Sequence, residues 1–157
     1  MSAILSDQDI KRLVAEKKCL PLAYNVKIQV KPKRGHKERE LEIKGEDGNE
    51  FCLILRESSF NPLDFSIILT YKLPQSNVLF RLRRYNGKSH EHTNIIERSS
   101  FYDYHIHMAT ERYQAIGARE DSFAEPSNRF SNFSEAFRCL VKDCGFDFPT
   151  GSQISLF

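Results

Sequence analysis

The chain of 157 residues contains no tryptophan, no long apolar run and little net charge, with a formal value of +2. No segment approaches the roughly 20 consecutive apolar residues that a helix needs to cross a bilayer, so we expect no membrane partner. The N-terminal residues, MSAILSDQD, have neither the basic region nor the apolar stretch of a secretory signal peptide. The small net charge excludes a chain that is basic throughout, so any nucleic-acid-binding patch is expected to be local.

The cysteines lack the paired C-x-x-C spacing that is typical of zinc sites and redox motifs. They are Cys19, Cys52, Cys139 and Cys144. Because Cys52 lies in an apolar segment and no pairing pattern is present, we predict free thiols and a cytoplasmic location, where thiols stay reduced. The sequence also has no internal repeat and no low-complexity tract. Its length therefore predicts one domain, residues 1–148, followed by a flexible tail, residues 149–157.

Two segments have the caps and the apolar spacing of amphipathic helices. The first runs from Ser6, a good N-cap residue, to about Lys18. The second covers residues 133–144, where apolar side chains recur at helical spacing. Asn132 precedes it as a predicted N-cap, and Gly145 follows it, where the left-handed conformation that ends many helices favours glycine.

Short segments of alternating apolar and polar residues lie between these helices and predict antiparallel strands joined by turns. The series begins at residues 26–30, and residues 66–71 are apolar on both sides, which indicates a central strand. Residues 118–128, AREDSFAEPSN, have the composition of a loop. We therefore predict an α+β fold, an antiparallel meander of about five to seven strands with an N-terminal and a C-terminal helix.

The stretch from Val78 to Tyr113 holds four of the five histidines, as two His-x-His pairs. Its Asn86-Gly87 dipeptide is typical of a type I′ hairpin turn, because that turn needs positive φ at both central residues. Such a hairpin would pair Tyr85 with Lys88, Arg83 with His90, and Arg81 with His92. Because side chains alternate across a strand, one polar face would then contain Arg81, Arg83, Tyr85, Lys88, His90 and His92.

A third extended run places Asp103, His105 and His107 on one side. This polar face suggests several kinds of chemistry. The histidines could bind a divalent transition metal, with Asp103, His105 and His107 as candidate ligands. They could act as general acid and base on phosphodiesters while Arg81 and Arg83 hold the phosphate. The face could also bind nucleic-acid backbone passively. Alternatively, it is a solvated sheet surface whose histidines pair with Glu91, Asp103 and Glu111.

The last five residues carry the most specific pattern in the chain: Gln153, Ile154, Ser155, Leu156 and Phe157. This QISLF ending resembles the short peptide by which many bacterial proteins bind the DNA polymerase sliding clamp. The family pattern is Gln, an aliphatic residue, Ser or Asp, Leu and Phe, and all five positions match. The resemblance implies that Leu156 and Phe157 anchor the peptide in a hydrophobic cleft of the clamp. The alternative is that the segment docks on its own domain as a last strand.

The domain itself resembles, at a lower level, a group of uncharacterised small bacterial and mobile-element proteins. The segments that carry the resemblance are RYNGKSHEHTN, DYHIHMATERYQ and LVKDCGF. The R-Y-N strand and the His-rich strands after it also resemble toxins of certain toxin–antitoxin pairs. Neither resemblance implies a catalytic residue.

Together these patterns predict a protein that binds the bacterial replication clamp through its tail. It would act as a phage- or plasmid-type, or toxin-like, inhibitor of DNA replication, because an occupied cleft excludes polymerase. This hypothesis needs no enzyme activity and no cofactor. The alternative is a histidine- or metal-dependent nuclease, either a toxin-like ribonuclease or a DNase recruited by the clamp, whose candidate catalytic residues are His90, His92, His105, His107, Arg81 and Arg83.

Overall fold

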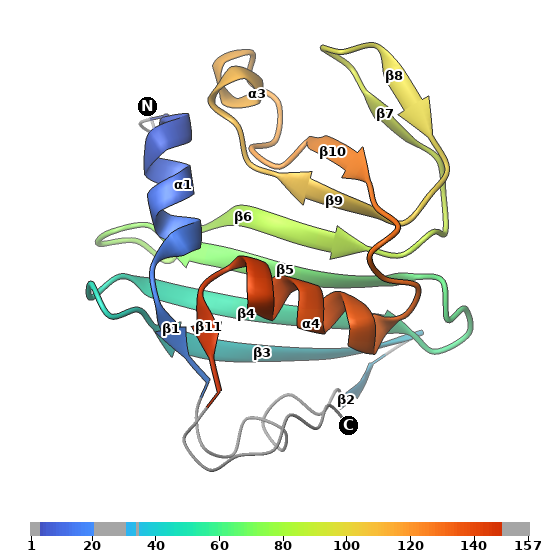
Figure 1. Cartoon of the computed structure of the whole chain (residues 1–157), viewed down its shortest axis with the longest axis horizontal. Coiled ribbons are helices and arrows are strands. Elements are labelled where there is room, and N and C mark those ends of the chain that lie inside the picture. The colour runs from blue at the N-terminus through green and yellow to red at the C-terminus, as the bar shows by residue number, and fades with distance from the viewer. Residues whose placement is uncertain (1–3, 21–30, 34, 149–157) are drawn as a thin grey trace.

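The computed structural model describes residues 4–20, 31–33 and 35–148. Within these residues it confirms the predicted α+β fold, in which seven strands form one antiparallel sheet of order β10-β9-β6-β5-β4-β3-β2. Helices α1 (Asp7–Ala15) and α4 (Phe133–Asp143) lie on the same face of that sheet (Figure 1). The predicted strand at residues 26–30 and the tail at residues 149–157 lie outside the described residues.

The strands of the main sheet follow one another as a meander, with an excursion between β6 and β9. Their bounds are β2 (Lys31–Lys33), β3 (His36–Lys44), β4 (Glu50–Ser58), β5 (Phe65–Lys72), β6 (Leu79–Asn86), β9 (His105–Met108) and β10 (Phe123–Pro126). The excursion is a separate hairpin, β7 (His92–Asn94) with β8 (Ser99–Phe101), and a short helix α3 (Glu111–Ala115) links β9 to β10. As predicted, β5 is the central strand.

Both predicted helix starts are confirmed by their caps. The Ser6 hydroxyl accepts a hydrogen bond from the Asp9 backbone N–H at 3.1 Å, and the Asn132 side chain accepts one from the Glu135 N–H at 2.9 Å. Gly145 follows α4 with a φ of +74°. The first helix is shorter than predicted, because the chain turns at Glu16 into strand β1 (Lys18–Cys19).

Lys18 binds the C-terminal ends of α1 and α4. Strand β1 pairs in parallel with β11 (Phe146–Asp147), directly after α4. The buried Lys18 ammonium donates to the carbonyls of Leu13 (2.9 Å), Val14 (3.0 Å), Glu16 (2.8 Å) and Cys144 (2.8 Å). A cation is favourable at this position because the last carbonyls of each helix lack partners and carry partial negative charge.

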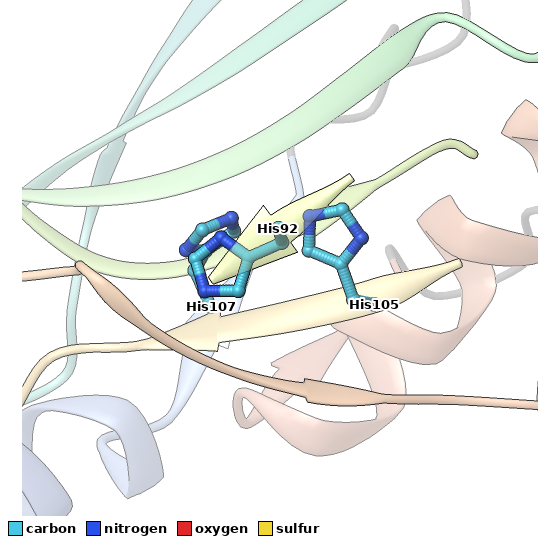
Figure 2. A group of neighbouring side chains, drawn as sticks. All are labelled: His92, His105 and His107. Atoms are coloured by element: carbon cyan, nitrogen blue, oxygen red, sulfur yellow. The ribbon is translucent and has the colours of Figure 1, made fainter. Parts of the chain in front are cut away.

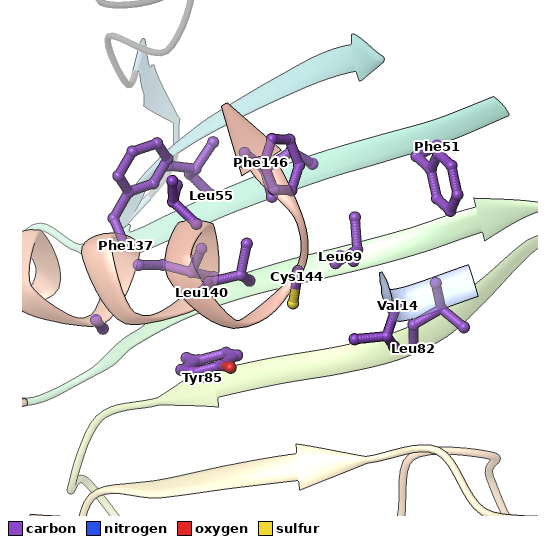
Figure 3. Close-up of a cluster of buried hydrophobic side chains, with 14 of the residues drawn as sticks. Val14, Phe51, Leu55, Leu69, Leu82, Tyr85, Phe137, Leu140, Cys144 and Phe146 are labelled. Carbon is purple, nitrogen blue, oxygen red and sulfur yellow. The ribbon is translucent and has the colours of Figure 1, made fainter. Parts of the chain in front are cut away.

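The hydrophobic core fills the layer between the helices and the sheet (Figure 3). Its members include Val14, Phe51, Leu55, Leu69, Leu82, Tyr85, Phe137, Leu140, Cys144 and Phe146. All four cysteines are in the described part of the chain and are unpaired, as predicted. Among the described helices, none is both long and apolar enough to cross a bilayer.

The predicted hairpin at Asn86-Gly87 is wrong. Strand β6 pairs with β5 on one side and with β9 on the other, so it has no edge left for residues 88–92. Gly87 is not among the glycines with positive φ, and its N–H donates to the Phe65 carbonyl at 2.9 Å. Pairing with β9 uses the same edge of β6 that the local hairpin would use, and it also buries His105, Ile106 and His107, so the long-range ladder prevails.

A bulge in the β5–β6 ladder changes which arginines lie on which face. Thr70 pairs with Arg81, but the preceding Leu69 pairs with Arg83, so β6 holds one extra residue there. Beyond the bulge, Arg83 lies on the helix-covered face and Arg84 on the opposite face. The predicted alternation, which placed Arg81 and Arg83 together, is therefore broken. Residues 118–128 are not simply a loop either, because β10 adds an edge strand there.

Candidate metal centre

Three histidines converge beside the outer strands of the sheet (Figure 2). His105 and His107 come from β9 and are buried on one face, since residues two apart on a strand point the same way. His92 comes from β7 and is half-buried. One ring nitrogen of each histidine lies within 4.8 Å of those of the other two. The cluster therefore brings one member of the first His-x-His pair to both members of the second.

The hydrogen bonds of His105 and His107 assign their tautomers. His105 Nδ1 lies 2.8 Å from the backbone carbonyl of Asp103, and His107 Nδ1 lies 2.7 Å from that of Asp121. A carbonyl oxygen only accepts, so both Nδ1 atoms carry the hydrogen and both Nε2 atoms keep a lone pair. Among the described residues, the buried His105 Nε2 has no hydrogen-bond partner.

Asn94 assigns the tautomer of His92. Its side-chain oxygen accepts from the Ala124 N–H at 2.9 Å, and its side-chain nitrogen donates to the Ala124 carbonyl at 2.8 Å, which fixes the amide orientation. The same oxygen lies 2.7 Å from His92 Nε2, so that nitrogen is the donor, and in the neutral imidazole the lone pair is then on His92 Nδ1. Each imidazole thus donates from one nitrogen to a fixed oxygen and leaves the other free, which is the arrangement of metal-bound histidines.

The electrostatic surroundings keep two of these histidines neutral. Burial is the main cause that lowers the pKa of His105 to about 4 and the pKa of His107 to about 2. The positive charge of Arg84 lowers the pKa of His107 further. A transition metal binds neutral imidazole, so these pKa values give the ligand form at neutral pH.

Asp121 connects the cluster to two arginines. Its carboxylate is fully buried; Oδ2 accepts from Arg84 Nε at 2.9 Å, and Oδ1 lies 3.4 Å from Arg119 Nε. Its backbone carbonyl is the acceptor for His107. An open pocket of about 280 Å³ lies here, and its lining includes Arg84, His90, His92, His107, Arg119 and Asp121.

The structure separates the predicted arginines from this site. Arg83 points toward Tyr85, with its Nη1 3.4 Å from the phenol oxygen, on the face that the helices cover. Arg81 pairs with Glu120 at 3.6 Å and does not line the pocket. The bulge in β6 is the physical reason for Arg83, since one extra residue reverses the side to which later side chains point. Arg81 precedes the bulge and is held by Glu120 instead.

In the predicted ligand set of Asp103, His105 and His107, the structure corrects one residue, Asp103. Asp103 is exposed and offers its backbone carbonyl to His105, so His92 takes its place as third group. His90 lines the pocket with its ring 6.4 Å from that of His105, but it is not part of the three-histidine cluster.

The predicted carboxylate partners of the histidines are also wrong. No described hydrogen bond joins a histidine to the side chain of Glu91, Asp103 or Glu111. The acceptors for the three clustered histidines are instead two backbone carbonyls and the amide oxygen of Asn94, and His90 Nδ1 lies 3.1 Å from the Ser89 hydroxyl oxygen. Sequence reasoning missed Arg84, Asn94 and Asp121 as site residues. From the sequence, Glu120 and Asp121 are predicted to lie in a solvated loop. No local signal identifies Asp121 as a site residue, because its burial depends on the pairing of β9 with β10.

The arrangement offers three imidazole nitrogen ligands and an open side. Bonds of about 2.0–2.1 Å to zinc would bring two ligand nitrogens to roughly 3.4 Å, so binding would draw the rings inward from their present spacing. Imidazole suits zinc, copper, iron and nickel. His92 and His107 line the pocket, which leaves a coordination position accessible to water or a ligand.

Fold and site together define a small α+β domain with a buried three-histidine cluster beside an arginine-containing pocket. The chain belongs to a family of unknown function (DUF6978), whose model matches residues 5–144. That match covers helices α1, α3 and α4, the whole main sheet and all three clustered histidines. No curated protein and no solved structure matches the chain.

Proposed function

We propose that His92, His105 and His107 hold a divalent transition metal ion and that the domain is a metal-dependent hydrolase. The observation that carries the proposal is the convergence of three imidazoles, each of which has one ring nitrogen tied to a fixed oxygen. The buried His105 Nε2 supports it most directly, because a lone pair without a partner is costly there unless a ligand fills the site.

The open side of the cluster favours a catalytic over a purely structural ion. Structural zinc sites take four protein ligands, whereas catalytic sites take three and leave one position to water. Such an ion lowers the pKa of its bound water to about 7, which supplies a nucleophile at neutral pH. Among the described residues, the group contains three histidines and no fourth cysteine or carboxylate ligand.

Elemental analysis of the purified protein, after equilibration with zinc and removal of excess, tests this proposal. We expect one ion per chain in the wild type, and loss of that ion in His92→Ala, which removes a ligand that is only half-buried. His90→Ala is the matched control, since it removes a neighbouring histidine outside the cluster and should keep the ion. A wild-type protein that retains no zinc, cobalt or nickel would refute the metal site.

We also propose that residues 153–157 bind the bacterial sliding clamp. The support is the five-position match of QISLF to the clamp-binding pattern. These residues lie outside the described part of the chain. Bound to the clamp, the protein would exclude polymerase by competition for one cleft, or would bring the hydrolytic domain to replicating DNA.

A labelled peptide of residues 149–157, titrated against purified clamp, tests the second proposal. Leu156→Ala with Phe157→Ala should abolish binding, because each anchor contributes roughly 1.5–3 kcal/mol when buried. Gly151→Ala is a control outside the motif and should bind unchanged. Equal binding by the double variant, or none by the wild type, would contradict the proposal.

A further inference from the structure

The pocket beside the three histidines has one more positive charge than its own residues neutralise. Arg84 and Arg119 both line it, and Asp121 is the only carboxylate among its described lining residues. That one carboxylate contacts both guanidinium groups, at 2.9 Å to Arg84 and 3.4 Å to Arg119. The other titratable lining groups are three histidines and Tyr113, so an anionic ligand is the natural complement.

The two arginines are presented in a way that suits a polyatomic anion. Arg84 is mostly buried and donates to Asp121 through Nε alone among the described residues, which leaves its two terminal nitrogens for a ligand. Arg119 has about half of its side chain exposed and approaches Asp121 from a different position. Guanidinium groups bind phosphate through two parallel hydrogen bonds, and a tetrahedral phosphoryl group has enough oxygens for both arginines.

The pairing of β6 with β9 places Arg84 of the pocket next to the histidines. Arg84 and His107 are directly paired residues of β6 and β9, so their side chains lie next to each other on one face. Asp121 reinforces this register, because its carboxylate holds Arg84 while its backbone carbonyl holds His107. An anion on the arginines would therefore lie beside the ligand nitrogens of the cluster.

We infer that this pocket is a phosphate subsite and that the substrate of the proposed hydrolase is a phosphate ester. The inference rests on the proposed function for the reaction, but the anion subsite itself needs only Arg84, Arg119 and Asp121. In the hydrolysis, the oxygen of one water forms a bond to phosphorus as the ester P–O bond breaks. One water proton goes to the leaving alcohol oxygen and the other stays with the phosphate. No oxidant or reductant is required.

Calorimetric titration with inorganic phosphate tests the subsite, with zinc-loaded and metal-free protein measured separately. Arg119→Gln should weaken phosphate binding about tenfold, the loss expected for one charge-assisted hydrogen bond. Arg81→Gln is the matched control, because it removes an arginine of similar exposure, paired with the adjacent Glu120, outside the pocket. We expect its phosphate binding to be unchanged.

The outcomes separate this inference from the metal proposal. Phosphate binding by metal-free protein that depends on Arg119 supports the subsite even if no zinc is retained. Zinc-loaded protein that binds no phosphate, or binds it equally in both arginine variants, overturns the subsite while the metal site stands.

Cleavage assays then distinguish the source of the phosphoryl group. Nitrophenyl phosphate represents a monoester and bis(nitrophenyl) phosphate a diester, and cleavage of either, reduced in Arg119→Gln, supports the inference. Nitrophenyl acetate, a carboxylic ester, is the contrast. Its cleavage at equal rates in the wild type and in Arg119→Gln, with neither phosphate ester cleaved, would overturn the substrate class.

Discussion

Asp121 combines three roles that belong to different parts of the site. Its carboxylate accepts a hydrogen bond from Arg84 and lies within ion-pair distance of Arg119, and its backbone carbonyl accepts a hydrogen bond from His107. Burial alone would lower the pKa of Arg84, and the negative charge of Asp121 opposes that effect. A fully buried carboxylate of this kind is tolerated only because cations pair with it, so its loss should be felt by the whole site.

We predict that Asp121→Asn destabilises the domain by about 3–5 kcal/mol, because it leaves the charge of Arg84 without its partner. Urea unfolding followed by circular dichroism measures the change. Glu120→Gln is the control, since Glu120 pairs with the more exposed Arg81, and its removal should cost about 1 kcal/mol or less. Similar losses in the two variants would show that the Asp121 pair contributes no more than a surface ion pair.

At the scale of the secondary-structure elements, Lys18 joins the ends of two helices that are far apart in the sequence. Its ammonium satisfies carbonyls at the ends of α1 and α4, and the backbone beside it joins β1 to β11. Burial is the main cause that lowers the pKa of Lys18, to about 8, while Glu16 opposes the shift. One side chain thus replaces the caps that two separate helices would otherwise need.

We predict that Lys18→Met destabilises the protein by roughly 3 kcal/mol or more, since it leaves several buried carbonyls without donors. Lys17→Met changes the exposed neighbour and should have little effect. Thermal and urea unfolding of both variants provide the comparison. Equal stability of the two would mean that water replaces the ammonium without loss.

Gly87 follows β6, and close packing at this position, instead of a turn conformation, is what requires a glycine. A Cβ atom at Gly87 would lie 2.0 Å from the Leu63 carbonyl oxygen, whereas one at Gly48 would meet nothing within 4 Å. Gly48 has a φ of +89°, and Gly87 is not among the positive-φ residues. The two glycines are therefore needed for different reasons.

Substitution by asparagine distinguishes a need for positive φ from a need for space, because asparagine tolerates positive φ but carries a full side chain. We predict that Gly87→Asn costs about 1–3 kcal/mol through overpacking, and that Gly48→Asn costs a few tenths. The midpoint of urea unfolding measures both. A harmless Gly87→Asn with a damaging Gly48→Asn would reverse the assignment and favour a left-handed turn after β6.

At the scale of the whole molecule, the proposed metal site and the proposed tail peptide should act independently. The three histidines lie within residues 5–144, which the family model matches, and the QISLF ending lies beyond them. An ion bound to the folded state alone raises stability by about 2.7 kcal/mol at 100 times its Kd. For a domain of this length, that corresponds to a rise in Tm of roughly 5–11 °C.

We predict that zinc raises the Tm of the wild type and of a variant lacking residues 149–157, and that chelator reverses the rise in both. His92→Ala should show no rise. The truncated variant should in turn lose clamp binding while it keeps its metal. Scanning calorimetry with and without chelator measures the first effect. A rise in Tm that persists in His92→Ala would place the ion elsewhere.

The sequence by itself determined the features that depend on a few neighbouring residues. The caps at Ser6 and Asn132, the glycine after α4 and the apolar pattern of β5 all act within one turn or one strand. His105 and His107 were predictable for the same reason, since alternation puts residues two apart on one face of any strand.

Only the tertiary structure decided which strand lies beside β6, and with it the membership of the site. The backbone groups along a strand edge accept any partner, so the choice between a local hairpin and β9 depended on burial summed over the whole domain. That choice brought His92 to His105 and His107. One extra residue in β6 then placed Arg84 instead of Arg83 on the face with the histidines, because a single-residue shift turns every later side chain to the opposite face.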